Sequence, residues 1–263
     1  MIAQLLSDMG GEPAALLILL VVGHVFGDFL VQNQWIASRK EQHWGVLLLH
    51  VGLVFVAHAA VLWPFLSWRL ITGLLGLSVL HLVIDAARAR ACGRWGASLA
   101  AFFVDQVLHL GAGFILWRLV ISWTGGVASA WSPTVAWLTW YARWSMVAAA
   151  YVFNGRGGTR IVRGVLERFP KAVPSEADGG ENEYEMGRTI GSLERYLALT
   201  LVLFNQWAAL GLIMAVKAIA RFPEFTRQRH KDFAEYYLIG TLTSVLVALA
   251  SGIIVGLTML WVH

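Results

Sequence analysis

The sequence predicts an all-α polytopic membrane protein, a transmembrane helical bundle of six or seven spans with a cytoplasmic amphipathic helix. The first observation is composition: of 263 residues, 58% are hydrophobic and only 14% are charged, whereas a soluble domain carries about 25% charged residues. The second is that the apolar residues form runs of about 18 or more, long enough to cross ~30 Å of hydrocarbon. These observations exclude a soluble enzyme, a disordered chain and a nucleic-acid-binding module. The single cysteine, Cys92, excludes an intrachain disulfide.

Six apolar segments are long and continuous enough to be predicted as spans. Proline lies only near their boundaries, as expected where helices break between spans. The predicted spans are 13–31, 45–66, 70–87, 97–120, 134–153 and 236–262.

A seventh apolar segment, 196–216, has Asn205 and Gln206 at its middle. Its length and continuity favour a seventh span, whereas a re-entrant hairpin turning at these two residues would keep the following basic residues in the cytoplasm. The sequence leaves both open. The predicted organisation is a membrane bundle over 1–153, a cytoplasmic amphipathic helix and acidic loop over 154–188, and a C-terminal membrane hairpin over 189–263.

Basic residues in the loops predict the orientation. Five Lys and Arg residues lie in segments 34–44 and 88–98, against two in the loops on the opposite side. Cytoplasmic loops carry the excess of such residues, so we expect these two segments in the cytoplasm and the N-terminus outside.

Segment 156–171 has the pattern of an interfacial amphipathic helix. Its Arg and Lys residues fall on one side of a helical wheel and its apolar residues on the other, a pattern that favours seating on anionic lipid at the cytoplasmic surface. The alternative is a docking surface for a partner protein. The acidic, Gly-containing stretch 175–185 is predicted as a loop.

Ionisable side chains inside spans are costly and indicate function. Three predicted spans each carry a His and an Asp four residues apart, a spacing that places both on one helix face. Because the direction of the chain alternates, all three Asp residues are predicted toward the cytoplasm with the His one turn deeper, and His50 is level with the Asp layer. The pairs are His24 with Asp28, His81 with Asp85, and His109 with Asp105.

Imidazole and carboxylate ligands in this arrangement predict a divalent metal: zinc, manganese or iron. The candidate ligands exceed the need of one ion, so either two ions bind or some members orient the others through hydrogen bonds. The alternative is that each pair is only an intramembrane hydrogen bond that holds the bundle together. The predicted metal ligands are Asp28, His81, Asp85, Asp105 and His109, with His24, His50, Gln32 and Gln106 as further ligands or as their hydrogen-bond partners.

The motifs that carry these residues resemble an uncharacterised bacterial polytopic inner-membrane family, a domain of unknown function, over residues 15–120. The resemblance implies the fold and a multi-pass location in the bacterial inner membrane, without an established activity. A weaker likeness is to membrane-bound metal-dependent hydrolases, which also carry His-x-x-x-Asp on spans. The motifs are Gly23-His24-x-x-Gly27-Asp28-Phe29-x-x-Gln32, Leu80-His81-x-x-x-Asp85 and Asp105-Gln106-x-x-His109.

The leading functional hypothesis is an intramembrane metal-dependent hydrolase of a lipid-linked phosphate or ester. The alternatives are a proton- or metal-coupled transporter and a non-catalytic membrane scaffold. Lys217 and Arg221, at the ends of predicted spans, are predicted to serve helix packing; the alternative is that they clamp an anionic headgroup near the metal site. The expected partners are the lipid bilayer, with anionic lipid at 156–171, and no nucleic acid; a homo-oligomer or a partner membrane protein stays open as an alternative.

Overall fold

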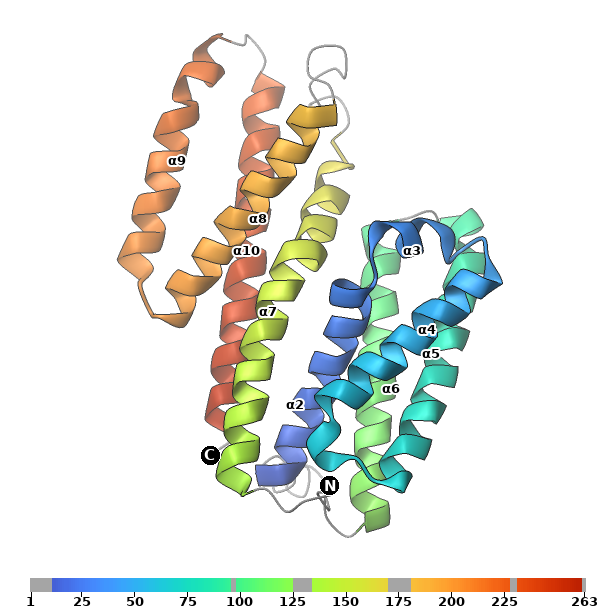
Figure 1. Ribbon diagram of the computed structural model, residues 1–263. Helices are drawn as coiled ribbons and strands as arrows, with labels where there is room; N and C mark the ends of the chain where they lie inside the picture. The colour runs from blue at the N-terminus through green and yellow to red at the C-terminus, as the bar shows by residue number, and fades with distance from the viewer. Residues whose placement is uncertain (1–10, 96–97, 125–133, 170–180, 228–230, 262–263) are drawn as a thin grey trace. The chain divides into compact units, whose positions relative to one another are not determined.

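A computed structural model describes residues 11–95, 98–124, 134–169, 181–227 and 231–261. Every element in these residues is helical (Figure 1). The helices are α2 (Gly11–Val25), the π-helical η1 (Phe26–Val31), α3 (Gln34–Arg39), α4 (Trp44–Val61), the 3-10 turn η2 (Trp63–Phe65), α5 (Trp68–Trp95), α6 (Leu99–Thr124), α7 (Val135–Leu166), α8 (Glu181–Leu203), α9 (Trp207–Arg227) and α10 (Lys231–Trp261).

Five helices in the described residues are long and apolar enough to cross a membrane, by length and composition. This arrangement is compatible with a multi-pass membrane protein and confirms the all-helical class. The five candidate spans are Gly11–Val31, Trp44–Val61, Trp68–Arg90, Leu99–Trp123 and Glu235–Met259, with Trp207–Ile219 as a shorter apolar helix.

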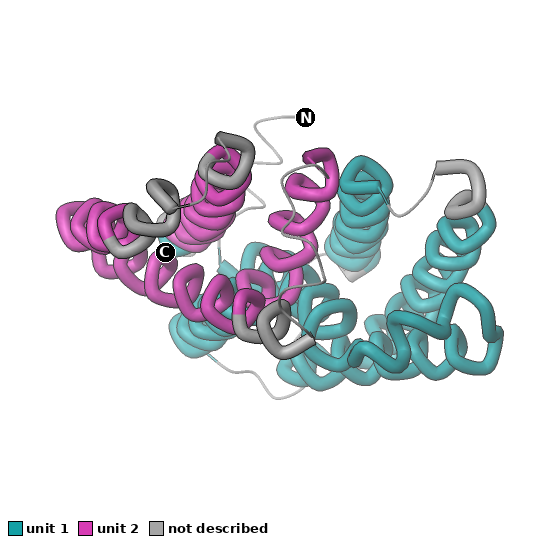
Figure 2. Tube along the Cα trace, turned by 90° about the horizontal axis from the view of Figure 1, so that it is seen from above, with its two compact units in different colours: residues 1–152, 257–263 teal, residues 153–256 magenta. Residues whose placement is uncertain are grey.

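The chain divides into two compact units, coloured separately in Figure 2. Unit 1 comprises Met1–Val152 and Leu257–His263, and unit 2 comprises Phe153–Gly256. In unit 1, α2, α4, α5 and α6 form a closed ring in which each helix packs on two of the others. Segment 34–44 and the start of α6 lie at the same end of this ring (Figure 1).

The ring of unit 1 buries polar side chains and exposes apolar ones. Its buried histidines and aspartates lie inside, whereas Val79 and Val107 are 62% and 67% exposed on the outside. An apolar outer surface with a polar interior is the pattern of a bundle surrounded by lipid, where water cannot solvate interior charges. At the other end of the ring, Trp117 on α6 links this helix to α2 by donating a hydrogen bond from Nε1 to the carbonyl oxygen of Pro13, at 2.7 Å.

Two glycines of α2 and η1 allow these segments to approach α4 closely. A Cβ added at Gly23 would lie 2.6 Å from the ring of His58 and 3.1 Å from its Cα. A Cβ at Gly27 would lie 3.1 Å from Val54. Small residues four apart let helix backbones pack tightly. The two glycines of the first motif therefore act in helix packing.

The segment 196–216 is not one helix, so the preference for a continuous seventh span is wrong. Helix α8 ends at Leu203 and α9 begins at Trp207. Between them Asn205 has a left-handed backbone with φ of 57°, a conformation that Asn tolerates better than most residues, and its side chain accepts a hydrogen bond from Trp207 Nε1. Helices α8 and α9 form a hairpin that turns where Asn205 and Gln206 predict a turn.

The amphipathic segment 156–171 is not a separate helix either. Helix α7 runs without a break from Val135 to Leu166, through the predicted boundary at 153 and 154. The burial is still amphipathic: Arg156, Arg160 and Arg163 are exposed, and the apolar residues between them are half-buried. Residues 170–180 lie outside the described part of the chain, and they include most of the predicted acidic loop.

Unit 2 is held together by a buried arginine. Arg195 on α8 is 3% exposed. It donates from Nε to the Asn154 carbonyl oxygen on α7 at 2.6 Å, and from Nη1 to Ser244 Oγ on α10 at 3.4 Å. Its Nη2 also donates to Thr159 Oγ1 at 2.6 Å. A guanidinium offers five donors in a fixed fork, so one side chain links three helices.

Candidate metal centre

The three His/Asp pairs all point into the interior of unit 1. Asp85 and His81 share one face of α5, and Asp105 and His109 share one face of α6. The spacing of four residues produces this, because side chains one turn apart lie above one another on a helix. All six paired residues and His50 are buried: His24, Asp28, His81, Asp85, Asp105 and His109 from the pairs, with His50 from α4.

Asp28 lies in the π-helical segment η1, Phe26–Val31, which continues α2. A π-helical turn holds extra backbone compared with an α-helical turn, and such turns are frequent at functional sites. Gln32 ends this segment with an extended backbone and is half-buried. The chain then turns into α3, which is capped by the Asn33 side chain accepting from the Ile36 N–H at 2.9 Å.

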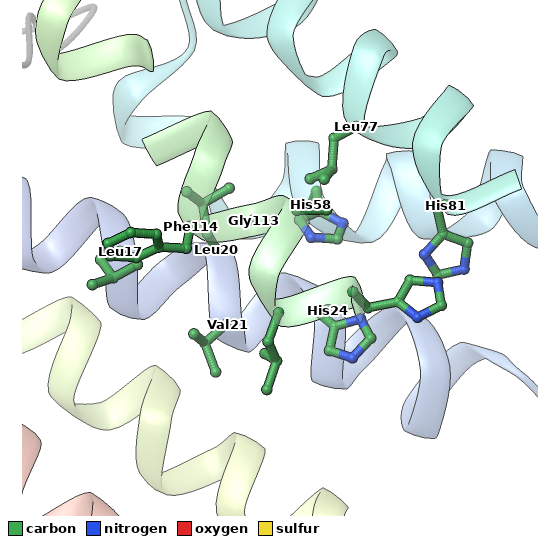
Figure 3. Close-up of a pocket in the computed structure, with 12 residues that line it drawn as sticks. Leu17, Leu20, Val21, His24, His58, Leu77, His81, Gly113 and Phe114 are labelled. Carbon is green, nitrogen blue, oxygen red and sulfur yellow. The ribbon is translucent and has the colours of Figure 1, made fainter. Parts of the chain in front are cut away.

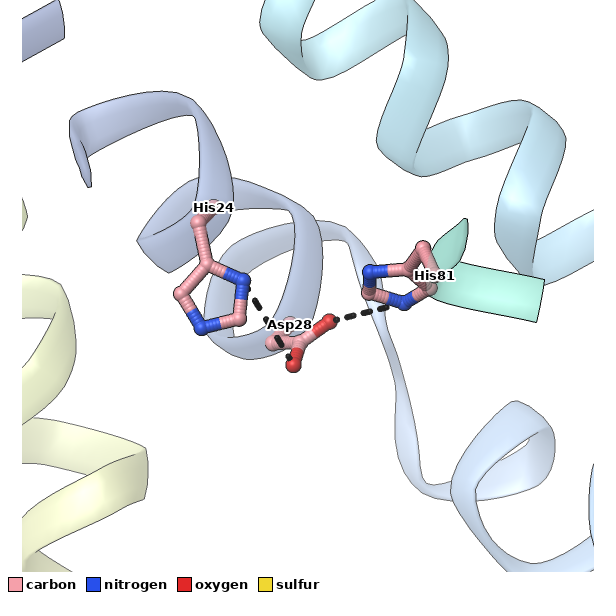
Figure 4. A group of neighbouring side chains, drawn as sticks. All are labelled: His24, Asp28 and His81. Atoms are coloured by element: carbon pink, nitrogen blue, oxygen red, sulfur yellow. Dashed lines mark ion pairs between the residues drawn. The ribbon is translucent and has the colours of Figure 1, made fainter. Parts of the chain in front are cut away.

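Two imidazole nitrogens lie between two carboxylates at the centre of the site. His50 Nε2 and His81 Nε2 are 3.2 Å apart. Asp28 Oδ1 lies 3.5 Å from the first and 3.6 Å from the second. Asp85 Oδ2 lies 3.4 Å and 3.5 Å from the same two nitrogens. Figure 4 shows His24 and His81 on either side of Asp28. Four donor atoms from η1, α4 and α5 therefore enclose one small volume.

Asp105 and His109 add further donor atoms from α6. His109 Nδ1 lies 2.8 Å from the carbonyl oxygen of Asp105, and a carbonyl only accepts, so the proton is on Nδ1 and Nε2 carries a lone pair. Besides His50 Nδ1, three buried atoms of the site lack a hydrogen-bond partner among the described residues: His109 Nε2, Asp105 Oδ1 and Asp28 Oδ1. All three carry lone pairs, and buried acceptors of this kind are normally satisfied. Asp28, Asp105 and His109 form one group of candidate ligands, so a cation bound through these three atoms would satisfy them.

The candidate ligands form three groups of three residues. Within each group, one donor atom from each residue lies within 4.8 Å of the other two. Ligand bonds of about 2.0–2.2 Å to one ion place neighbouring ligand atoms ~3.4 Å apart, and the central distances of 3.2–3.6 Å match this. Asp28 and His81 each belong to two of the groups, so the groups overlap in one cluster. The groups are His24, Asp28 and His81; His50, His81 and Asp85; and Asp28, Asp105 and His109.

Gln106 fixes the hydrogen bonding of His24. Gln106 Nε2 donates to Asp105 Oδ2 at 3.1 Å, which turns its amide oxygen toward His24 Nε2 at 3.2 Å. The amide oxygen only accepts, so His24 carries its proton on Nε2 and its Nδ1 lone pair faces Asp28 Oδ2, 3.9 Å away. Partners of this kind set the tautomer and orientation of metal-binding histidines.

Sequence reasoning missed two cations at this site, Lys40 and Arg88, which it used only to predict orientation. Lys40 Nζ lies 2.8 Å from Asp85 Oδ2, and Arg88 Nη1 lies 3.2 Å from Asp105 Oδ2. A local signal existed for Arg88, because it follows Asp85 by about one helical turn and therefore lies on the same face of the helix, next to the Asp layer. No comparable signal existed for Lys40. It approaches Asp85 because the preceding helix α3 packs on α4.

The charges of the site nearly balance. Three carboxylates face two cations, Lys40 and Arg88, so with neutral imidazoles one negative charge is left over. A buried net charge is costly in a low-dielectric environment unless a counter-ion accompanies it. The site therefore favours one additional cation and disfavours several.

A small cavity of about 20 Å³ adjoins the imidazoles (Figure 3). His24 and His81 lie at one end of it, and Leu17 and Phe114 at the other. The volume exceeds the ~10–15 Å³ that a single water needs. His58 also lines it, but its Nδ1 already lies 2.9 Å from the Val54 carbonyl oxygen. The imidazoles supply the polar partners that a buried water requires.

The predicted headgroup clamp lies in unit 2. Lys217 on α9 donates to Glu194 on α8, and its Nζ lies 5.3 Å from the centre of the Tyr237 ring. The pair joins the two helices of the hairpin. The side chain of Arg221 lies outside the described residues, as does that of Cys92.

One of three comparisons with known proteins gave a match, to a family model. No curated protein and no solved structure matches the chain. The matched residues, 16–138, include all three motifs and every residue of the candidate metal centre. This confirms the predicted resemblance to an uncharacterised family: residues 16–138 match the model of the family described as protein of unknown function, DUF3307.

Proposed function

We propose that this chain is a multi-pass membrane protein with a divalent metal centre inside unit 1, and that the centre hydrolyses a lipid-linked phosphate or ester. The observation that carries the proposal is that Asp28, Asp105 and His109 form one group of candidate ligands and that each also has a buried lone-pair atom without a hydrogen-bond partner among the described residues. Packing alone gives little reason to bury three such acceptors in one group of residues, since each unsatisfied group costs about 1–3 kcal/mol.

The donor set favours zinc, manganese or iron. All of its members are imidazoles and carboxylates, ligands that suit these metals, whereas copper(I) and iron–sulfur clusters prefer thiolates. The charge balance favours a single ion, because one divalent cation turns the leftover charge of −1 into +1, while two would leave +3 unpaired in a buried site.

Hydrolysis would use the candidate ligands and the adjoining cavity. Asp28, Asp105 and His109, with the other candidate ligands, would hold a divalent ion, whose chemistry would be to acidify water and to polarise a substrate oxygen. Water adds to the phosphorus or carbonyl carbon, the bond to the leaving oxygen breaks, and that oxygen takes up a proton. The cavity beside His24 and His81 has the volume for the attacking water, and an Asp carboxylate of the cluster can accept its proton.

A proton- or metal-coupled transporter is the second candidate, favoured by the continuous row of imidazoles. The ring centres of His24 and His109 are 5.3 Å apart, those of His109 and His81 4.1 Å, and those of His81 and His50 5.2 Å. Chains of buried histidines and carboxylates also conduct protons or ions.

The membrane setting completes the proposal. We place segments 34–44 and 88–98 in the cytoplasm and the N-terminus outside, in a bacterial inner membrane. The exposed arginines Arg156, Arg160 and Arg163 of α7 contact anionic lipid in this arrangement. A homo-oligomer or a partner membrane protein would use the same surface.

Three measurements on the detergent-purified full chain test the proposed function. Elemental analysis after extensive dialysis should find one zinc, manganese or iron per chain. Release of phosphate or fatty acid from lipid substrates should require that metal. Flux of protons or metal in proteoliposomes without hydrolysis would favour the transporter, and a protein free of metal with no effect of added metal would refute both.

A further inference from the structure

Lys40 and Arg88 are more accessible than the carboxylates that they contact. Their side chains are 10% and 24% exposed, whereas the carboxylates that they contact are 2% and 4% exposed. Lys40 directly follows α3, and Arg88 lies near the C-terminal end of α5, which is at the same end of unit 1 as α3 (Figure 1). A molecule that reaches the buried donors from this end therefore passes the two cations first.

The charge of the site indicates what such a molecule carries. With one divalent ion among the carboxylates, the site has one positive charge in excess. A neutral ester would leave that charge uncompensated, whereas a phosphate group with one negative charge would neutralise it. This excess charge requires the proposed metal centre, and it favours a phosphate over a neutral ester, the two substrate classes that the proposed function allows.

We propose that Lys40 and Arg88 bind the phosphate of an anionic phosphate-bearing ligand at the metal centre. The ligand is a phosphodiester or a singly charged phosphate monoester, either on a lipid or free. The guanidinium of Arg88 matches the geometry of two phosphate oxygens, and the ammonium of Lys40 acts as a mobile point charge.

The present partners of both cations are compatible with this role. Each contacts a carboxylate that also belongs to a metal-donor group, Asp85 for Lys40 and Asp105 for Arg88. A divalent ion on these carboxylates takes up their charge and weakens their attraction for the two side chains. The same cations that neutralise the site without metal then become available to an anion.

The test compares Lys40→Met and Arg88→Met with Arg90→Met in the full chain. Arg90 lies two residues after Arg88 on the same helix, but it contacts the Trp44 ring and the Ala86 carbonyl oxygen and, among the residues that the structure describes, no carboxylate. Manganese affinity is measured by electron paramagnetic resonance. Phosphate affinity is measured from the manganese-induced broadening of the phosphorus NMR signal, with inorganic phosphate and with dihexanoyl phosphatidylglycerol as separate probes.

We expect Lys40→Met and Arg88→Met each to weaken phosphate binding about tenfold or more, because each removes one charge-assisted hydrogen bond. Both variants should bind manganese as tightly as the wild type or more tightly. Arg90→Met should change neither affinity. Lys40→Arg and Arg88→Lys keep the charge and should restore most phosphate binding. Tighter binding of the lipid probe would assign a lipid source, and tighter binding of inorganic phosphate a free one.

Different results refute the inference and the proposed function. If the wild type binds manganese but neither phosphate probe, or if both Met variants bind phosphate like Arg90→Met, the phosphate site is refuted and the metal centre stands. If the wild type binds no manganese, the phosphate site is refuted, and the proposed metal centre is refuted with it if elemental analysis also finds no zinc or iron. Because each Met variant tests the site independently, misfolding of one leaves the decision to the other.

Discussion

Lys40 Nζ lies 2.8 Å from Asp85 Oδ2, although the two residues are 45 positions apart in the sequence. Lys40 follows the short helix α3, Gln34–Arg39, and its backbone N–H donates to the Ile36 carbonyl oxygen. Ile36 is buried and α3 packs on α4. The chain between the first two candidate spans is thus folded against the bundle, and it supplies a cation to the buried carboxylates.

Asp105→Asn should lower both metal affinity and thermal stability of the metal-loaded protein. Asn keeps the shape of Asp but loses its charge and one anionic ligand. A ligand that binds only the folded state stabilises it by about 2.7 kcal/mol at a hundredfold excess over Kd, so the melting temperature of the wild type should fall when a chelator is added. The mutant should melt lower than the wild type and respond less to chelator.

Melting curves in detergent with and without chelator check this prediction. Glu194→Gln is the control, because Glu194 pairs with Lys217 in unit 2 and the variant should keep the chelator response of the wild type. A wild type unmoved by chelator, with Asp105→Asn melting beside it, would mean that the His/Asp pairs serve packing only.

His109→Leu and His58→Leu should differ in metal binding although they remove similar side chains. Both histidines are buried and contact a backbone carbonyl oxygen one turn earlier through Nδ1. Only His109 belongs to a donor group with a buried Nε2 that lacks a hydrogen-bond partner. His109→Leu should therefore lose metal, measured by elemental analysis, and His58→Leu should retain it. Equal metal content in both variants contradicts the assignment of His109.

Gly23→Ala should destabilise unit 1 by about 1–3 kcal/mol, the usual cost of overpacking. The new Cβ would lie 2.6 Å from the ring of His58 and 3.1 Å from its Cα, so the backbones of α2 and α4 must separate. Gly52→Ala on α4 is the control, since its Cβ meets nothing within 4 Å and Ala favours a helix over Gly. Denaturation in detergent should rank Gly52→Ala at or above the wild type and Gly23→Ala below it.

A cysteine at Ser38 should be protected from a membrane-impermeant maleimide added to the periplasm. Ser38 is exposed on α3, in a segment whose basic residues predict a cytoplasmic location. Ser122→Cys, near the end of α6, should be labelled because it lies on the opposite side. Both variants are made in a Cys92→Ser background. Labelling of Ser38→Cys from the periplasm would contradict the predicted cytoplasmic location of segment 34–44.

Periodicity along the chain was enough to predict the helical membrane class and the faces of the His/Asp pairs. The four-residue spacing of His81 and Asp85 places them together on any helix, whatever the rest of the fold. The turn near Asn205 was also detectable, because a polar pair inside an apolar run marks a break. The preference for a continuous seventh span failed because hydropathy averages over a window and does not report a single left-handed residue.

At α7 the error was the reverse: hydropathy predicted a helix boundary where the helix continues. The change from an apolar stretch to a basic amphipathic one predicts a boundary near residues 153 and 154, yet the helix continues to Leu166. Backbone hydrogen bonds within a helix do not depend on which face is polar, so a change in surroundings need not end it. Whether a helix continues is decided by packing, and in unit 2 that packing includes the buried Arg195 and the residues it holds on α7 and α10.

The sequence by itself determined the class of protein, the spacing of the pairs and the layer of carboxylates, because each depends on residues within one helix. Only the tertiary structure decided that Lys40 joins Asp85, that Arg88 joins Asp105, and that lone-pair atoms of Asp28, Asp105 and His109 remain without hydrogen-bond partners. These features depend on which side chains from different helices meet. Their geometry depends on how the helices rotate and pack against one another, and local sequence patterns carry no such information.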